Sequence, residues 1–167
     1  MKASQLKGLA VITVSNAAKV GQVEDVFFDA TYRRVLGMGL KKSVFGQAEA
    51  VSRTSVTAVG NDSLNISSPE AINLEDRFAD LAGAIKLSQI EGTKVVTEGG
   101  DLVGTITDMP LDDEATEVTA YLLNAPLWER IRHQEPEFSA DQVVRVGEGG
   151  IMIVTNTVAE HLHPPKA

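Results

Sequence analysis

The chain has 167 residues, of which 43% are hydrophobic, and a formal net charge of −8. This length and composition suit one domain or two small ones and exclude wholesale disorder. Cysteine is absent, which excludes disulfides, thiolate metal ligands and a cysteine nucleophile. No apolar run reaches the roughly 18 residues that a membrane-spanning helix needs, so we expect a soluble, cytoplasmic protein with no membrane span.

The acidic charge is confined to the second half of the chain. Residues 1–84 hold nine Lys/Arg and nine Asp/Glu, whereas residues 85–167 hold six and fourteen. Because affinity for nucleic acids depends on contacts between phosphates and a basic face, no direct DNA binding is expected. A solvated surface that keeps the protein in solution is the simplest interpretation of the acidic half.

Short apolar stretches rich in β-branched residues run through both halves, separated by turn residues. In the first half they lie at 9–14, 19–28, 35–40, 51–59 and 63–66. In the second half they lie at 94–97, 102–109, 118–123, 142–146 and 151–155. Strands at this spacing, with glycine-bearing turns, predict a mainly β protein built from small antiparallel barrels.

The two halves repeat one motif. Residues 20–25 read VGQVED and residues 103–108 read VGTITD, an offset of 83. The preceding SQLKG at 4–8 matches SQIEG at 88–92 at an offset of 84, and 59–66 aligns with 146–153 at 87. Three anchors in the same order indicate an internal duplication, which takes precedence over other sequence signals.

The segment between the two copies has a helical pattern. Leu74, Phe78, Leu81 and Ile85 recur at helical spacing after acidic residues that are typical of a helix start. We therefore expect a first barrel at 1–72, a short linker helix at 73–87, a second barrel at 88–160 and a flexible tail at 161–167. A barrel of about 70 residues buries little surface, so we also expect the two units to contact each other.

The repeated motifs resemble the PRC-barrel family, which is named for the cytoplasmic domain of the photosynthetic reaction centre H subunit and also forms the C-terminal domain of a ribosome maturation factor. The pattern of that family, a glycine after leucine, then Gly-x-Val-x-Asp and a late Val-Gly turn, is present in the first copy. The second copy repeats it with Ile90 in place of the leucine and Ile106 in place of the valine. The matching residues are Gly8, Gly21, Asp25 and Gly60 in the first copy and Gly92, Gly104, Asp108 and Gly147 in the second. The chain thus resembles a tandem PRC-barrel protein.

This resemblance implies a non-catalytic protein-binding or scaffold module rather than an enzyme, with no cofactor. The protein partner is not identified by the sequence, and a homodimer is possible. An accessory role in RNA metabolism or ribosome assembly is one alternative, by analogy with the maturation factor. A ligand- or metal-responsive sensor with a cleft between the barrels is another. Fold-level analogy does not decide among them.

Asp25 and Asp108 occupy matched positions after the strand glycines. They could be two equivalent acidic groups that bind a metal or accept a proton. We favour a structural role, in which each carboxylate accepts backbone N–H bonds at the end of a strand. Gly21 and Gly104 are expected at a bulge or at a close approach of backbones.

Other candidate sites are weaker. The acidic cluster Asp112-Asp113-Glu114 with Glu117 could bind a hard cation, but it lacks the calcium-loop spacing and is interpreted as a solvated hairpin tip. His161 and His163 could hold a metal only with partners from elsewhere, and His133 is isolated in the sequence. The glycine-rich stretches at 37–39 and 147–150 lack the context of nucleotide-binding loops.

Two features could contribute to a binding surface. Trp128, the only tryptophan, follows a predicted strand, and tryptophan is common in interface hot spots, although a plug at a barrel end is the simpler role. The pairs Arg33-Arg34 and Lys41-Lys42 could contact an acidic partner, such as the second half of a neighbouring copy. Solvated strand ends are the simpler interpretation.

Overall fold

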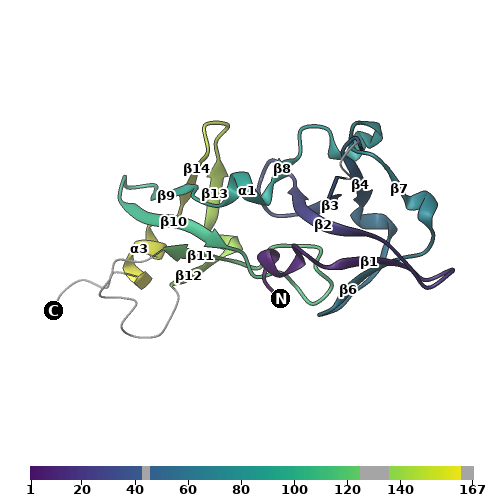
Figure 1. The fold of residues 1–167 in the computed structure, drawn as a ribbon. Helices are drawn as coiled ribbons and strands as arrows, with labels where there is room; N and C mark the ends of the chain where they lie inside the picture. The colour runs from purple at the N-terminus through teal and green to yellow at the C-terminus, as the bar shows by residue number, and fades with distance from the viewer. Residues whose placement is uncertain (43–45, 125–135, 163–167) are drawn as a thin grey trace.

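The computed structural model describes residues 1–42, 46–124 and 136–162. It shows two mainly β units side by side, one formed by the first half of the chain and the other by the second (Figure 1). The N-terminus lies between the two units in the view of Figure 1. No helix in the described part of the chain is long and apolar enough to cross a membrane.

The first unit is one sheet with the order β5-β6-β1-β2-β3-β4-β7, and β8 also pairs with β2. Its strands are β1 (Ala10–Thr13), β2 (Ala18–Phe28), β3 (Val35–Leu40), β4 (Glu49–Ser52), β5 (Val56–Val59), β6 (Ser63–Ile66), β7 (Ile72–Leu74) and β8 (Ile85–Lys86). The stretch 51–59, expected to be a single strand, is interrupted by the 3-10 turn η2 (Arg53–Ser55). This turn lets the chain leave one part of the sheet and enter another.

The second unit repeats this plan with the order β12-β11-β10-β9-β14-β13. Its strands are β9 (Lys94–Thr97), β10 (Leu102–Asp108), β11 (Ala120–Asn124), β12 (Glu137–Ser139), β13 (Val143–Val146) and β14 (Ile151–Val154). A 3-10 turn, η6 (Ala140–Gln142), stands between β12 and β13 as η2 does between β4 and β5. The mainly β, duplicated architecture is therefore the one that the sequence predicted.

The expectation of purely antiparallel barrels is wrong at one pair in each unit. β1 runs parallel to β6, and β9 runs parallel to β14. The cause is the 3-10 turn, which carries β4 into β5 without a hairpin. Four reversals of direction then separate β1 from β6, and an even number brings the chain back in its starting direction. The same count applies to the second unit.

The expected linker helix at 73–87 does not form. Residues 72–74 instead pair with the edge strand β4, and Glu75 N–H donates to the carbonyl of Ala48 at 2.9 Å. Two 3-10 turns follow, η4 (Glu75–Arg77) and η5 (Ala79–Leu81), and then Gly83 adopts the left-handed conformation with φ +74°. The free hydrogen-bonding edge of β4 and this glycine outweigh the helical spacing of the apolar residues.

Some apolar residues of the linker pack on the first sheet apart from the main core, whereas Ile85 packs against the main core itself. Phe78, Leu81 and Ala84 form a small cluster with Phe27 and with residues of β3 and β4, separate from the main core. Gly37 permits this contact, because a Cβ there would lie 2.6 Å from the Val51 carbonyl oxygen and 3.0 Å from Leu81 Cδ2. The linker is therefore a layer on the first unit.

One hydrophobic core extends through both units. It contains residues of the first unit such as Val11 and Phe28 together with residues of the second such as Met109 and Met152, each with 0% of its surface exposed. The expected contact between the units is thus confirmed, and it is a shared core. Sharing a core is how two units of this size bury enough apolar surface to be stable.

The C-terminal part differs from the sequence-based expectation in one element. A helix, α3 (Asn156–Leu162), follows β14 and buries Val158 completely in the core. The expected flexible tail at 161–167 therefore begins within this helix, and residues 163–167 lie outside the described part. Asn156 Oδ1 accepts a 2.8 Å hydrogen bond from Gly99 N–H, so the helix start is fixed to the turn between β9 and β10.

Candidate binding surfaces and the junction between the units

The first residues of each unit cross over to the other unit. Lys2 forms an antiparallel bridge with Pro110, just beyond β10, while Lys86 of β8 pairs with Phe27 of β2. The backbone bond from Ala3 N–H to the Met109 carbonyl, at 2.8 Å, extends the first of these contacts. The two exchanges are equivalent under the duplication, so the units are interlocked rather than placed end to end.

The repeated aspartates fasten this exchange. Asp25 Oδ2 accepts a 2.7 Å hydrogen bond from Ser88 Oγ, which belongs to the second copy. Reciprocally, Asp108 accepts from both the backbone N–H of Ser4, at 3.1 Å, and the Ser4 hydroxyl. Each aspartate also accepts the N–H of the next residue, Val26 or Met109, at 2.8 Å. The two aspartates therefore join the units through reciprocal bonds from Ser88 and Ser4. We call these two serine–aspartate contacts the Ser–Asp latches.

A second reciprocal contact joins the turns that follow β2 and β10. Val35 N–H donates to the Thr116 carbonyl, and Val118 N–H donates to the Arg33 carbonyl, each at 2.8 Å. Arg34 and Glu117 form an isolated bridge between these two bonds. The symmetry of these contacts relates the two units by an approximate two-fold axis near that bridge, as in an isologous dimer.

The acidic cluster at 112–117 takes part in this junction. Asp112 closes its turn by accepting from Thr116 N–H at 2.7 Å and Thr116 Oγ1 at 2.6 Å. Partial burial raises the pKa of Asp112, but the hydrogen bonds from Thr116 outweigh it and hold the pKa below its ordinary value. Arg53 of the first unit donates to the carbonyls of Ala115 and Glu114.

The interpretation of this cluster as a solvated hairpin tip holds only for part of it. Asp113 and Glu114 are exposed, whereas Ala115 has 1% of its surface exposed. Across the described ranges, no three His, Asp or Glu side chains gather in a way that could hold a metal ion. Trp128, His133 and His163, as well as the side chain of His161, lie outside the described part.

Tyr121 makes a buried contact across the junction. Its hydroxyl donates a 2.8 Å hydrogen bond to the Tyr32 carbonyl of the first unit, and its ring stacks on Phe138 with centroids 5.3 Å apart. Burial raises the pKa of the Tyr121 hydroxyl well above its ordinary value. Tyr32 has φ 61°, so the bond holds a strained turn in place.

The repeated glycines lie at the turns and bulges of this framework. Gly8 and Gly92 have φ of +88° and +86°, and their N–H groups donate to Val23 and Ile106 at 2.8 Å. The pairings of β1 with β2 and of β9 with β10 shift register next to Gly21 and Gly104. Gly60 and Gly147 donate at 2.9 Å to the carbonyls of Ser63 and Ile151, closing the turns before β6 and β14.

The basic pairs have different surroundings. Arg33 Nη2 lies 2.9 Å from Asp141 Oδ1 of the second unit, and this hydrogen bond raises the pKa of Arg33. The acidic partner considered for this pair is therefore found within the same chain. Lys41 is exposed, and Lys42 lines a groove on the first unit.

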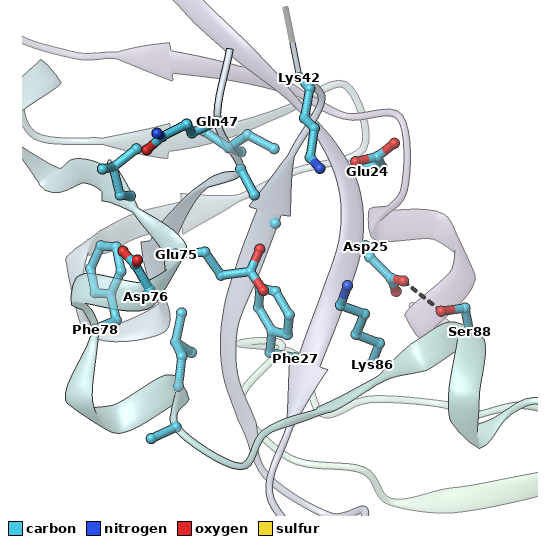
Figure 2. Close-up of a pocket in the computed structure, with 16 residues that line it drawn as sticks. Glu24, Asp25, Phe27, Lys42, Gln47, Glu75, Asp76, Phe78, Lys86 and Ser88 are labelled. Atoms are coloured by element: carbon cyan, nitrogen blue, oxygen red, sulfur yellow. Dashed lines mark hydrogen bonds between the residues drawn. The ribbon is translucent and has the colours of Figure 1, made fainter.

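That groove is an open hollow of about 1080 Å³ between β2–β3 and the linker. Figure 2 shows Phe27 in its floor, with Glu75 and Asp76 on one side and Lys86 and the Asp25–Ser88 latch on the other. The other labelled residues that line it are Glu24, Lys42, Gln47 and Phe78. Four carboxylates and two lysines thus surround a partly aromatic floor that the linker already covers in part.

The outward face of the second sheet is a different kind of surface. The pairings place Leu102, Val96, Ile153 and Arg145 in one row across β10, β9, β14 and β13 (Figure 1). The next row contains Ile151 and Lys94. Leu102 is 63% exposed and Ile151 45% exposed, and Val144, next to Arg145, is 49% exposed. We call Val96, Leu102, Ile151 and Ile153 the aliphatic face.

The first unit provides an internal comparison for this face. Its equivalent rows are Lys19, Ile12, Asn65 and Ala58, and then Ser63 and Ala10. Leu102, Ile151 and Ile153 therefore stand where the first unit has Lys19, Ser63 and Asn65, and Val144 stands where it has Thr57. The framework alone does not require aliphatic residues at these positions, because the first unit forms it with polar ones.

The difference between the two faces is not visible when residues 59–66 are aligned with residues 146–153. The offset of 87 is correct for Gly60 and Gly147, but Ala10 pairs with Ser63 and Lys94 with Ile151, which gives an offset of 88 for β6 and β14. The turn before β14 is one residue longer. At the offset of 87, Ile151 aligns with Leu64, which is buried, although Ile151 is itself 45% exposed. A slip of one residue exchanges the two faces of a strand.

Two interlocked β units built from one duplicated plan define a tandem-barrel protein. A family model, described as the PRC-barrel domain, matches residues 1–71 and 82–160. The chain therefore belongs to the PRC-barrel family, whose domains are non-catalytic modules. No curated protein matches the chain.

Proposed function

We propose that this chain is a non-catalytic protein-binding module whose duplicated motif forms the framework and whose second unit contacts the partner. The observation that carries this proposal is the aliphatic face. Three of its four members replace polar residues of the first unit, and two of the four are at least 45% exposed. Contiguous exposed apolar surface rimmed by polar groups marks interaction sites.

The internal contacts account for the other candidate residues. Asp25 and Asp108 are engaged by Ser88 and Ser4, and Asp112 by Thr116. These groups support the junction, which leaves the face that differs between the units as the best candidate for recognition. We propose 1–72 and 88–160 as the two sequence units, with 73–87 between them.

Affinity purification from native lysate tests the proposal when it is performed with the natural chain and with a face variant. The variant carries Leu102→Lys, Ile151→Ser and Ile153→Asn, each taken from the matching position of the first unit. A partner protein that is retained after nuclease treatment and lost with the variant supports the proposal. A partner that both chains capture equally would contradict it.

The two alternatives give other outcomes in the same set of experiments. A partner that is lost on nuclease treatment would favour the role in RNA metabolism or ribosome assembly. Stabilisation by a metabolite or divalent cation in a thermal-shift screen would favour a sensor, for which the groove of the first unit is one available cavity.

A further inference from the structure

Two cations accompany the aliphatic face, in the half of the chain that carries the whole net negative charge. Lys94 pairs with Ile151 on β14, and Arg145 pairs with Ile153. Both side chains are exposed. In the described part of the chain, no carboxylate oxygen lies within 4.0 Å of a side-chain nitrogen of either residue. This is so although residues 85–167 hold fourteen Asp/Glu.

The first unit again provides the comparison. Lys94 stands where the first unit has Ala10, and Arg145 stands where it has Ala58. The second unit thus has cations at two positions of this face where the first has alanine, and an aliphatic side chain where the first has its one lysine, Lys19. A framework role explains neither change, since alanine suffices at both positions in the first unit.

We infer that the aliphatic face binds an amphipathic acidic segment of another protein, whose apolar side chains lie on Leu102, Val96 and Ile153 while its carboxylates meet Lys94 and Arg145. This inference rests on the proposed function and adds the chemistry of the partner. Burial of aliphatic side chains supplies most of the affinity, and the complementary charges fix the register and exclude basic segments.

Two other occupants fit the charges less well. A second copy that packs the same face against itself across a two-fold axis brings Lys94 and Arg145 towards the same cations of the partner copy. An anionic membrane surface is extended, so it would meet the exposed carboxylates of Glu98, Asp101 and Glu148, in the turns that border the face, together with the two cations. A short segment can instead place its carboxylates at Lys94 and Arg145 alone.

Selection from a library of random 16-residue peptides tests the inference directly. The full chain is the bait, and the counter-bait in each round carries Leu102→Ser, Ile151→Ser and Ile153→Asn, which removes the aliphatic side chains without adding a cation. We expect the enriched peptides to combine aliphatic residues with an excess of Asp and Glu. The Lys94→Ala/Arg145→Ala variant, which restores the residues of the first unit, should bind the best peptide roughly 2- to 30-fold more weakly.

A matched control is available in the first unit. Lys19→Ala/Lys41→Ala removes two exposed cations from that unit and should leave the peptide affinity within about twofold, because screening weakens distant charges. Circular dichroism and thermal unfolding check that all variants fold as the natural chain does. Amide chemical-shift changes on peptide binding should concentrate in β9, β10, β13 and β14.

Each other outcome overturns the inference in a recognisable way. Enriched peptides without excess acid, or an affinity that is insensitive to Lys94 and Arg145, would contradict the acidic partner but leave a protein-binding face. Binding to phosphatidylserine vesicles that is lost with the double variant would assign the face to membranes. A concentration-dependent dimer that the face variant abolishes would assign it to a second copy. No enrichment over the counter-bait would count against the proposed function as well.

Discussion

Ser88 donates a 2.7 Å hydrogen bond to Asp25, across the boundary between the two copies of the repeat. Its counterpart is the bond from Ser4 to Asp108 in the opposite direction. The serine and the aspartate of each copy therefore never pair with each other, only with the other copy. This exchange joins the two units through the matched serine and aspartate of each copy.

Removal of the Ser–Asp latches should destabilise the chain. Hydrogen bonds to charged groups contribute about 1.5–3 kcal/mol when they are well shielded, and these are partly exposed, so we expect Ser88→Ala to lower the free energy of unfolding by about 1 kcal/mol. Ser4→Ala should cost more, because the bond between Ser4 and Asp108 is partly buried whereas the bond between Ser88 and Asp25 is exposed. Urea unfolding at pH 7 measures both.

The control for the latches is Ser15→Ala. Ser15 is exposed, and its hydroxyl is in no hydrogen bond within the described ranges. This variant should unfold within about 0.5 kcal/mol of the natural chain. Latch variants that are as stable as the control would contradict the role given to the repeated aspartates.

Tyr121→Phe tests the buried contact across the junction. It removes the hydroxyl that donates to the Tyr32 carbonyl and leaves a buried acceptor unpaired, which should cost about 1–3 kcal/mol. For a chain of this size, the melting temperature should fall by roughly 2–4 °C for each kcal/mol. Tyr32→Phe, which keeps the carbonyl acceptor, should have a smaller effect, and the reverse order would contradict this role.

Tyr121 also predicts a change of stability at high pH. Because its pKa is raised in the folded chain, the unfolded chain loses this proton first, at about pH 10. The contribution of Tyr121 to stability is therefore complete below about pH 10 and declines as the pH rises above it. Phenolate absorbance that increases for this residue before unfolding, in a comparison with Tyr121→Phe, would contradict its burial.

Asp112 predicts a change at low pH. Its pKa is lowered in the folded chain, so the stability that it contributes is present at neutral pH and is lost as the pH falls below about 4. Thr116→Ala should cost roughly 1 kcal/mol at pH 7 and progressively less as the pH falls below about 4. Asp113→Asn, at an exposed position in the same turn, should have little effect at either pH. An equal cost of Thr116→Ala at pH 7 and pH 2 would contradict the carboxylate–hydroxyl bond.

The reciprocal junction predicts that one unit alone will dimerise. A fragment of residues 1–84 retains Ser4 and Asp25, and two copies of it can exchange their first residues as the two units do in the full chain. We expect its folding to be coupled to dimer formation, so its melting temperature should rise with concentration. Light scattering coupled to gel filtration measures the mass. A folded monomer would show that the exchange is dispensable.

The duplication and most strands could be predicted from the sequence, because both depend on local patterns. β3 and β9 begin and end at the expected residues, and Asp25 and Asp108 were expected to accept backbone N–H groups. The donors from the other copy were not expected, although Ser4 and Ser88 recur at matched positions. Residues far apart in the sequence reveal their pairing only when the topology is known.

The linker and the aliphatic face show why the rest could not be predicted. The helical spacing of apolar residues at 73–87 predicted a helix. Residues 72–74 instead pair with the open edge of β4, and Phe78 and Leu81 pack near Phe27. The face was hidden because one extra residue before β14 shifted the alignment. When a turn differs in length between two copies, an alignment of their sequences no longer shows which residues of the next strand share a face.

A graft of the face onto the first unit tests the central claim most directly, namely that the differing face binds the partner and the shared framework only supports it. The grafted chain carries Lys19→Leu, Ser63→Ile and Asn65→Ile, together with Ala10→Lys and Ala58→Arg. Isothermal titration with the best selected peptide should change from one bound peptide per chain to two. A stoichiometry that stays at one in a correctly folded graft would contradict the claim.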